Sequence, residues 1–138
     1  MRPFELIEHT ADIGVRAFGA SEAEAFQNTA VGMFSLITDL DLVREEECFD
    51  IQVQAEDRET LLVEWLNELL YLNDSRDLLL KRFEIKDLGE TSLRATACGE
   101  PIDRGRHELM TDIKAATYYM LKVKETPEGW MAEVIFDV

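Results

Sequence analysis

Several short stretches of the chain alternate between apolar and polar residues, which is the pattern of strands with one buried face. The clearest stretch has an apolar residue at every second position: Phe49, Ile51, Val53 and Ala55. In the last stretch, alternate residues from Trp130 to Phe136 share one face, and those from Met131 to Asp137 share the other. The pattern predicts strands over residues 4–8, 12–19, 49–55, 78–86, 93–98, 121–125 and 130–137.

Two longer stretches repeat apolar residues at a spacing of three or four, which predicts amphipathic helices. Ser21 is a favourable N-cap and Glu24 completes a capping box, so the first helix should begin there. Asp57 can cap the second helix in the same way. The apolar positions are Phe26, Ala30, Met33, Phe34 and Ile37 in the first helix and Leu62, Trp65, Leu66, Leu69 and Leu70 in the second. A third, short helix is expected over residues 107–116.

These elements favour an α+β fold. Their order lacks the regular βαβ alternation of a doubly wound fold, and hairpins supply much of the sheet. The chain has 138 residues, and domains of about 100–150 residues are the commonest, so residues 1–138 are predicted to form one domain. We therefore expect an α+β domain with a mostly antiparallel or mixed sheet, two main helices and a C-terminal hairpin.

The composition is strongly acidic, with 29 Asp and Glu against 14 Lys and Arg and a formal charge of −15. Nucleic-acid affinity depends on Lys and Arg that neutralise phosphates, so direct, stable binding to RNA or DNA is not expected. Adsorption to an anionic membrane is disfavoured for the same reason, whereas a cation or a basic protein partner suits the charge. The chain shows no secretory signal and no transmembrane stretch, and we expect a cytoplasmic protein.

The two cysteines, Cys48 and Cys98, lie far apart in the chain and do not form a C-x-x-C motif. They could form a disulfide, but a cytoplasmic location favours two buried free thiols. No set of Cys and His residues has the spacing of a structural zinc site.

No familiar catalytic motif is present, since the chain lacks a P-loop, G-x-S-x-G, G-x-G-x-x-G and H-E-x-x-H. Three segments remain as candidates. His9 and Asp12 could present ligands to a hard cation, or could simply form a turn. Asp137 adds a carboxylate beside Val138, where it could bind a cation or merely be solvated. Lys114 is the lone base in an apolar and aromatic stretch, and could contact an anion or extend into solvent.

Taken together, these segments resemble the archease family. The similar segments occur in the family's order over essentially the whole chain: residues 9–14, the central helix at 61–70, the loop at 106–109, the lysine motif at 113–118 and the end at 134–138. One position departs from the pattern. Archeases commonly carry a histidine after the tyrosine of the lysine motif, where this chain has Tyr119. A contribution of that histidine to the site would be lost here.

The resemblance implies an accessory protein of tRNA splicing and RNA repair rather than an enzyme. Its partner would be the RtcB-type RNA ligase, because archeases promote guanylylation of that ligase, support its multiple turnover and can broaden its nucleotide use. By the same resemblance, Asp12, Asp137 and Val138 match calcium-site positions and Lys114 matches a functionally important lysine. His9 is a candidate to support these ligands. Oxygen ligands of this kind suit Ca²⁺ or another hard divalent cation.

Two other classes of function stay open. The same carboxylates could bind Mg²⁺ in an independent metal-dependent hydrolase or nuclease, although no general base or basic groove is evident. Alternatively, the acidic surface could form a chaperone-like binding module for several RNA-processing enzymes. Nothing in the pattern specifies an oligomeric state.

Overall fold

The structure is a computed structural model that describes residues 2–9 and 12–138, with the main chain alone for His9 and Asp12. The elements follow one another in the order β1 (Phe4–His9), β2 (Asp12–Gly19), α1 (Glu22–Ile37), the 3-10 helix η1 (Leu40–Leu42), β3 (Glu47–Gln54), α2 (Arg58–Arg76), β4 (Leu78–Leu88), β5 (Ser92–Pro101), β6 (Ala115–Ala116), β7 (Lys122–Thr126) and β8 (Gly129–Asp137). Every strand predicted from the alternation is present, with bounds that agree to within a few residues.

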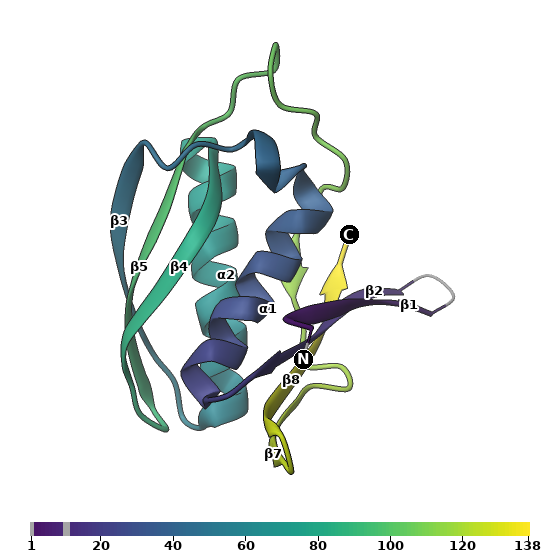
Figure 1. The fold of residues 1–138 in the computed structure, drawn as a ribbon, viewed down its shortest axis with the longest axis vertical. Helices are drawn as coiled ribbons and strands as arrows, with labels where there is room; N and C mark the ends of the chain where they lie inside the picture. The colour runs from purple at the N-terminus through teal and green to yellow at the C-terminus, as the bar shows by residue number, and fades with distance from the viewer. Residues whose placement is uncertain (1, 10–11) are drawn as a thin grey trace.

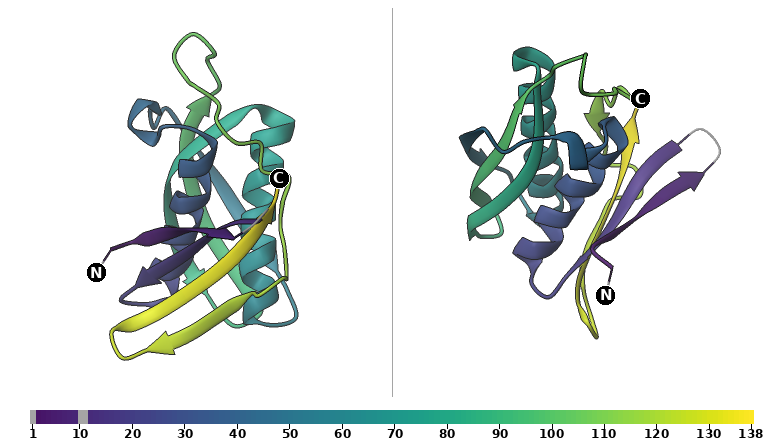
Figure 2. Two further views of the ribbon diagram at one scale, coloured as in Figure 1. Left: turned by 90° about the vertical axis from the view of Figure 1, so that its right-hand side faces the viewer. Right: turned by 45° about the horizontal axis from the view of Figure 1, so that its top comes forward.

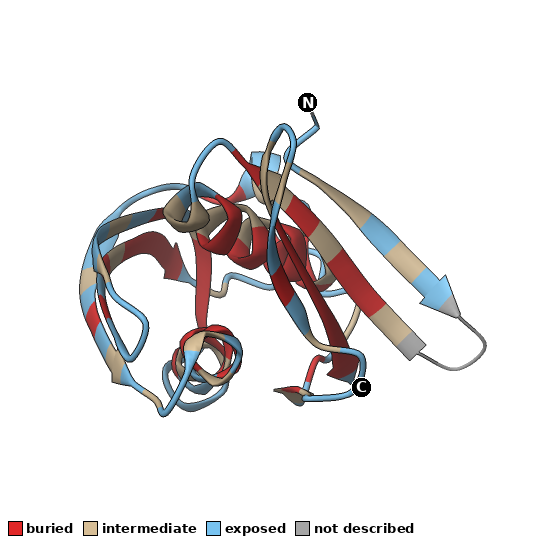
Figure 3. Ribbon diagram, turned by 90° about the horizontal axis from the view of Figure 1, so that it is seen from below, coloured by how far each residue is buried: buried red, intermediate tan, exposed pale blue. Residues whose placement is uncertain are grey.

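The two main helices lie between two antiparallel sheets (Figure 1, Figure 3). α1 packs against β2 and β8 on one side and against β4 on the other. α2 likewise contacts β3 and β4 of one sheet and β6 of the other. All the strand pairs of the described residues are antiparallel, and the predicted α+β fold class is confirmed. No helix in the described part of the chain is long and apolar enough to cross a membrane.

The larger sheet is built around β8. Its strand order is β1-β2-β8, and both β6 and β7 pair with the other edge of β8. β7 pairs with the first half of β8 in the predicted C-terminal hairpin, while β6 pairs with the last two residues of β8. The smaller sheet has the order β3-β5-β4. The hairpin of β1 and β2 extends past the helices (Figure 2), and Leu6 on β1 is accordingly half exposed.

Both predicted helix starts are confirmed. The Ser21 hydroxyl accepts a hydrogen bond from the Glu24 main-chain N–H at 3.1 Å. The Glu24 carboxylate accepts from the Ala20 N–H at 3.1 Å, one residue before the position that a standard capping box would use. The Asp57 carboxylate accepts from the Thr60 N–H at 2.8 Å at the start of α2. Local side chains therefore satisfy main-chain donors that have no partner within the helices.

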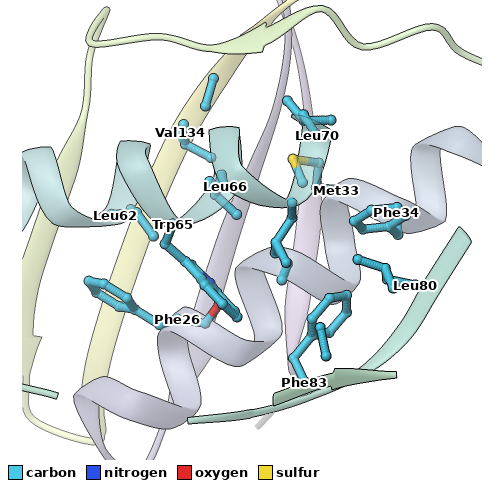
Figure 4. Packing of buried hydrophobic residues seen from close by; sticks show 14 of the residues in the cluster. Phe26, Met33, Phe34, Leu62, Trp65, Leu66, Leu70, Leu80, Phe83 and Val134 are labelled. Carbon is cyan, nitrogen blue, oxygen red and sulfur yellow. The ribbon is translucent and has the colours of Figure 1, made fainter. Parts of the chain in front are cut away.

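Trp65 of α2 joins the layers of the core (Figure 4). Its ring is fully buried, and its indole N–H donates to the Phe26 carbonyl of α1 at 3.1 Å. Phe83 of β4 meets the ring edge to face, with 6.1 Å between ring centroids. Because α2 contacts a sheet on each side, it buries more apolar residues than the single predicted face: Leu61, Leu62, Val63, Trp65, Leu66, Leu69, Leu70 and Leu72.

The short helix predicted over residues 107–116 is wrong. The described chain from Ile102 to Lys114 is irregular. The main-chain N–H of Met110 donates to the Ile37 carbonyl at 2.8 Å, and that of Thr111 donates to the Leu36 carbonyl at 3.2 Å. These donors therefore bond to the last carbonyls of α1, which have no partner within α1 itself. The pattern of residues 107–116 alone does not indicate these hydrogen bonds to α1.

The prediction of two buried free thiols is also wrong. Cys48 and Cys98 form a disulfide between β3 and β5, and Cys48 is exposed while Cys98 is buried. The antiparallel register places the two residues directly opposite each other, with their Cα atoms 4.1 Å apart. Strand register, which joins positions distant in the chain, decides this pairing.

Replacing both cysteines by serine, or reducing the disulfide, should destabilise the fold by about 4 kcal/mol, because the cross-link closes a 50-residue loop in the unfolded chain. Urea unfolding with and without reductant measures the effect. The Cys48→Ser/Cys98→Ser variant is the control, since its midpoint should not respond to reductant. Equal midpoints for the oxidised and reduced natural protein would contradict a stabilising cross-link.

Candidate functional site

Three predicted site segments meet at one end of the larger sheet. Ile13 pairs with Phe136 in the β2–β8 ladder, so Asp12 and Asp137 occupy the next position of that ladder. On the other edge of β8, the main-chain N–H of Lys114 donates to the Asp137 carbonyl at 2.8 Å. Figure 2 shows the end of β8 beside β6. Neighbouring strands lie about 4.8 Å apart, so the main chains of Asp12 and Lys114 flank that of Asp137 on its two sides.

Asn67 of α2 holds the lysine segment in place. Its amide oxygen accepts from the Ala116 N–H at 2.8 Å, and its amide nitrogen donates to the Ala116 carbonyl at 3.4 Å. On the opposite edge, the Thr117 N–H donates to the Ile135 carbonyl of β8 at 3.0 Å. The segment is therefore bound from both sides. We did not predict this role of Asn67. The sequence indicates it only through the position of this polar residue beside the apolar face of α2.

Gly14 lies in a strand and not in a loop, and it allows β2 to approach β8 closely. It lies in β2 opposite Ile135, and a Cβ atom there would overlap the Val134 carbonyl oxygen and come within 2.7 Å of the Ile135 Cδ1 atom. A side chain at this position would push β2 away from β8. The glycine thereby keeps the positions of Asp12 and Asp137 together.

The described candidate residues lie at the surface. Asp137 and Lys114 are exposed, and Val138 is 44% exposed. The predictions for the side chains of His9 and Asp12 fall outside the described residues. Among the residues that are described, no group of three or more His, Cys, Asp and Glu side chains is arranged to hold a metal ion.

Tyr119, at the position where the resemblance implies a histidine, lies in the loop between β6 and β7. This residue is 58% exposed, as is Tyr118. Met120, which follows, adopts a positive φ of 54°. The structure thus places the ring of Tyr119 at the surface, and the loss of a histidine's contribution stays a prediction.

A buried ionic cluster, which we did not predict, organises the segment before Lys114. The Glu100 carboxylate is 2% exposed and accepts hydrogen bonds from the Arg106 guanidinium, from the Arg44 main-chain N–H at 2.6 Å and from His107 Nε2 at 3.0 Å. The His107 Nδ1 accepts from the Asp103 N–H at 2.9 Å, so the ring hydrogen lies on Nε2 and is directed at Glu100. The turn after β5 is therefore folded around one carboxylate.

The Arg106 guanidinium lowers the pKa of Glu100 far below its ordinary value of 4.5, although burial acts in the opposite direction. The hydrogen bonds from Arg44 and His107 lower the pKa further. The pKa of Glu100 is lower in the folded state than in the unfolded state. The ionised carboxylate therefore stabilises the fold at pH values above the pKa that Glu100 has in the unfolded chain. That stabilisation is lost progressively as the pH falls below the pKa of the unfolded chain.

These features define a class of protein: an acidic α+β protein with two helices between two antiparallel sheets and candidate oxygen ligands where β2 and β6 flank the end of β8. Residues 4–138 match the archease protein family (MTH1598/TM1083). The chain is 39% identical over 142 residues to the protein archease of Thermococcus gammatolerans and 38% identical over 143 residues to that of Pyrococcus abyssi, with 100% of each chain covered. The protein belongs to the archease family.

Two solved structures share the fold. The solution structure of Methanobacterium thermoautotrophicum protein 1598 matches with a TM-score of 0.85 and 36% identity, over 100% of both chains. The crystal structure of an archease from Thermotoga maritima, described as a possible chaperone, matches with a TM-score of 0.64 and 26% identity, over 100% of this chain and 98% of that one. The resemblance seen in the sequence is therefore confirmed along the whole fold.

The Glu100→Gln substitution should destabilise the protein at neutral pH by about 3 kcal/mol, because it removes one partner of a buried ion pair. The variant should also lose less stability than the natural protein as the pH falls below about 4.5, because in the natural protein Glu100 of the unfolded chain binds a proton there. Urea unfolding between pH 3 and pH 7 measures both effects.

Glu84→Gln is the matched control, since Glu84 forms an exposed pair with Arg82 at 3.5 Å and exposed pairs contribute little. An unchanged acid dependence in Glu100→Gln would show that other carboxyl groups dominate it.

Proposed function

We propose that this protein is an accessory factor, not itself an enzyme, that activates an RtcB-type RNA ligase in tRNA splicing and RNA repair. It promotes guanylylation of the ligase, supports multiple turnover and broadens nucleotide use. Membership of the archease family supports the proposal. The observation that carries it is the convergence of Asp12, Asp137 and the segment that holds Lys114 at one end of the larger sheet.

The donor chemistry at this end of the sheet fits a hard cation, and we propose Ca²⁺. Asp137 and Val138 offer exposed oxygens, and the strand register sets Asp12 beside them. Carboxylate and carbonyl oxygens are the ligands that Ca²⁺ prefers, whereas softer metals favour Cys and His. A bound ion would neutralise the carboxylates and offer positive charge to an anionic group of the partner.

Lys114 supplies a second positive charge at the same end. Its main chain is bound to Asp137, while its exposed side chain lines a cavity of about 540 Å³. Within the described part of the chain, the Lys114 ammonium forms no salt bridge. We propose that this ammonium contacts an anionic group at the ligase active site, such as the phosphates of the bound nucleotide.

A chaperone-like binding module is the second candidate function. The description of the Thermotoga maritima relative as a possible chaperone favours it, as does the net charge of −15. Such a module would bind several basic RNA-processing enzymes in a salt-sensitive manner. Its binding would also be indifferent to substitution of Asp12 or Lys114.

The variants Asp12→Asn, Lys114→Met and Asp137→Asn should each reduce stimulation of ligase guanylylation about tenfold or more, because one contact to a charged group is worth about 1.5–3 kcal/mol. Transfer of labelled guanylate to the ligase measures the stimulation. Glu125→Gln, which removes an exposed charge from β7, is the control and should stimulate fully.

Undiminished stimulation by all three variants would refute the proposed site. Incubation of the protein with RNA and Mg²⁺ in the absence of ligase should yield no product, and cleavage there would favour the hydrolase instead.

Calcium at one hundred times its dissociation constant should stabilise the protein by about 2.7 kcal/mol, and a chelator should reverse the effect. The stabilisation should disappear in Asp137→Asn and persist in Asp41→Asn, which removes an exposed carboxylate from η1. Thermal unfolding with and without CaCl₂ measures it, and calorimetric titration gives the affinity directly. Equal responses of the two variants would exclude Asp137 as a ligand.

A further inference from the structure

A groove runs along the C-terminal half of α2 and includes the cavity that Lys114 lines. Two cavities, of about 540 and 310 Å³, lie between α2 and the irregular segment after β5. Both are lined by Asp74 of α2 and by Asp112 of the irregular segment, so they adjoin. We call this surface the α2 groove. Lys114 lines one of its cavities and Arg104 lines the other.

Large apolar side chains border the α2 groove and are open to solvent. Tyr71 of α2 is 63% exposed, and Met110 on the facing segment is 53% exposed. Leu109 beside it is 37% exposed. Contiguous exposed apolar patches mark interaction sites, whereas single exposed apolar residues need no explanation.

The acidic residues at the C-terminal end of α2 do not stabilise the helix. Asp74 lies in the last turn of α2 and Asp77 is its C-cap, yet the helix dipole disfavours negative charge at this end. Arg76, the basic residue of the last turn, lies over the Phe49 ring at 5.0 Å. Among the described residues, neither Asp74 nor Asp112 forms a salt bridge. Within the described part of the chain, the two carboxylates that both cavities share therefore have no direct ion-pair partner, although Lys114 and Arg104 line the same cavities.

The wall opposite α2 is held in a fixed position. The Thr38 hydroxyl donates to the Glu108 carbonyl at 2.7 Å, and the N–H groups of Met110 and Thr111 bond to the end of α1. Upstream, the Glu100 cluster anchors the start of the same segment. A groove with preorganised walls binds a partner without the cost of ordering them.

We propose that the α2 groove binds a segment of the protein partner that carries a Lys or Arg next to an apolar side chain. The cationic group lies between Asp74 and Asp112, and the apolar side chain packs against Tyr71 and Met110. The identity of the partner rests on the proposed function, so the segment belongs to the RNA ligase. Because Lys114 lines the same groove, docking there brings the Lys114 and Asp137 end of the sheet to the ligase.

Binding of the ligase to the full-length protein tests the proposal. The Asp74→Asn/Asp112→Asn variant should bind the ligase about tenfold more weakly and with a shallower dependence on salt, because two charges of the interface are lost. Tyr71→Ala should weaken binding without changing the salt dependence. The control Asp41→Asn/Asp50→Asn removes equal charge from η1 and from the exposed face of β3, and should bind like the natural protein. Calorimetric titration at two salt concentrations gives the dissociation constants.

Guanylylation at saturating concentrations separates docking from activation. The Asp74→Asn/Asp112→Asn variant should reach the full stimulated rate at higher protein concentration, whereas Asp137→Asn should not reach it. The same dissociation constant for the groove variant and the control would overturn the docking proposal and leave the proposed function standing. A natural protein that neither binds nor stimulates the ligase would overturn both. Self-association that the groove variant abolishes would assign the groove to a second copy of the chain and overturn the proposal.

Discussion

Enclosure of two helices between two antiparallel sheets is the constraint on which the rest of this structure depends. A helix that meets a sheet on each side needs a wider apolar face than a helix that meets one sheet, and α2 is buried in this way. Trp65 joins the layers, since its ring packs on β4 and its N–H bonds to α1. With the inner faces of both sheets filled, the candidate chemistry lies at strand ends and in connecting segments.

β8 carries the candidate site because two other segments pair with its last residues. β2 brings Asp12 to one edge and the lysine segment lies along the other. Gly14 permits the close approach of β2, and Asn67 binds the lysine segment from α2. Residues that contact no ligand therefore determine where Asp137 and Lys114 lie, and strand register sets the arrangement more than any loop does.

The irregular segment between β5 and β6 links stability to the proposed activity. Its start is folded around the Glu100 carboxylate, its middle bonds to the end of α1, and its end presents Lys114. The same segment forms one wall of the α2 groove. The carboxylates near the C-terminus of α2 lie at the end of the helix where the dipole disfavours negative charge, so they do not stabilise the helix.

The sequence by itself determined the features whose causes lie within a few neighbouring residues. Alternation located the strands, capping side chains located the starts of both helices, and the ordered motifs indicated the family. The roles of Asp12, Lys114 and Asp137 stay a prediction. Only the tertiary structure decided that Cys48 meets Cys98 and that residues 107–116 form no helix. It also decided that the charge of Glu100 is buried and paired. The physical reason is common to all three: the partner that satisfies each group comes from another element or turn, through register, main-chain hydrogen bonds or an ion pair, and a local pattern does not contain it.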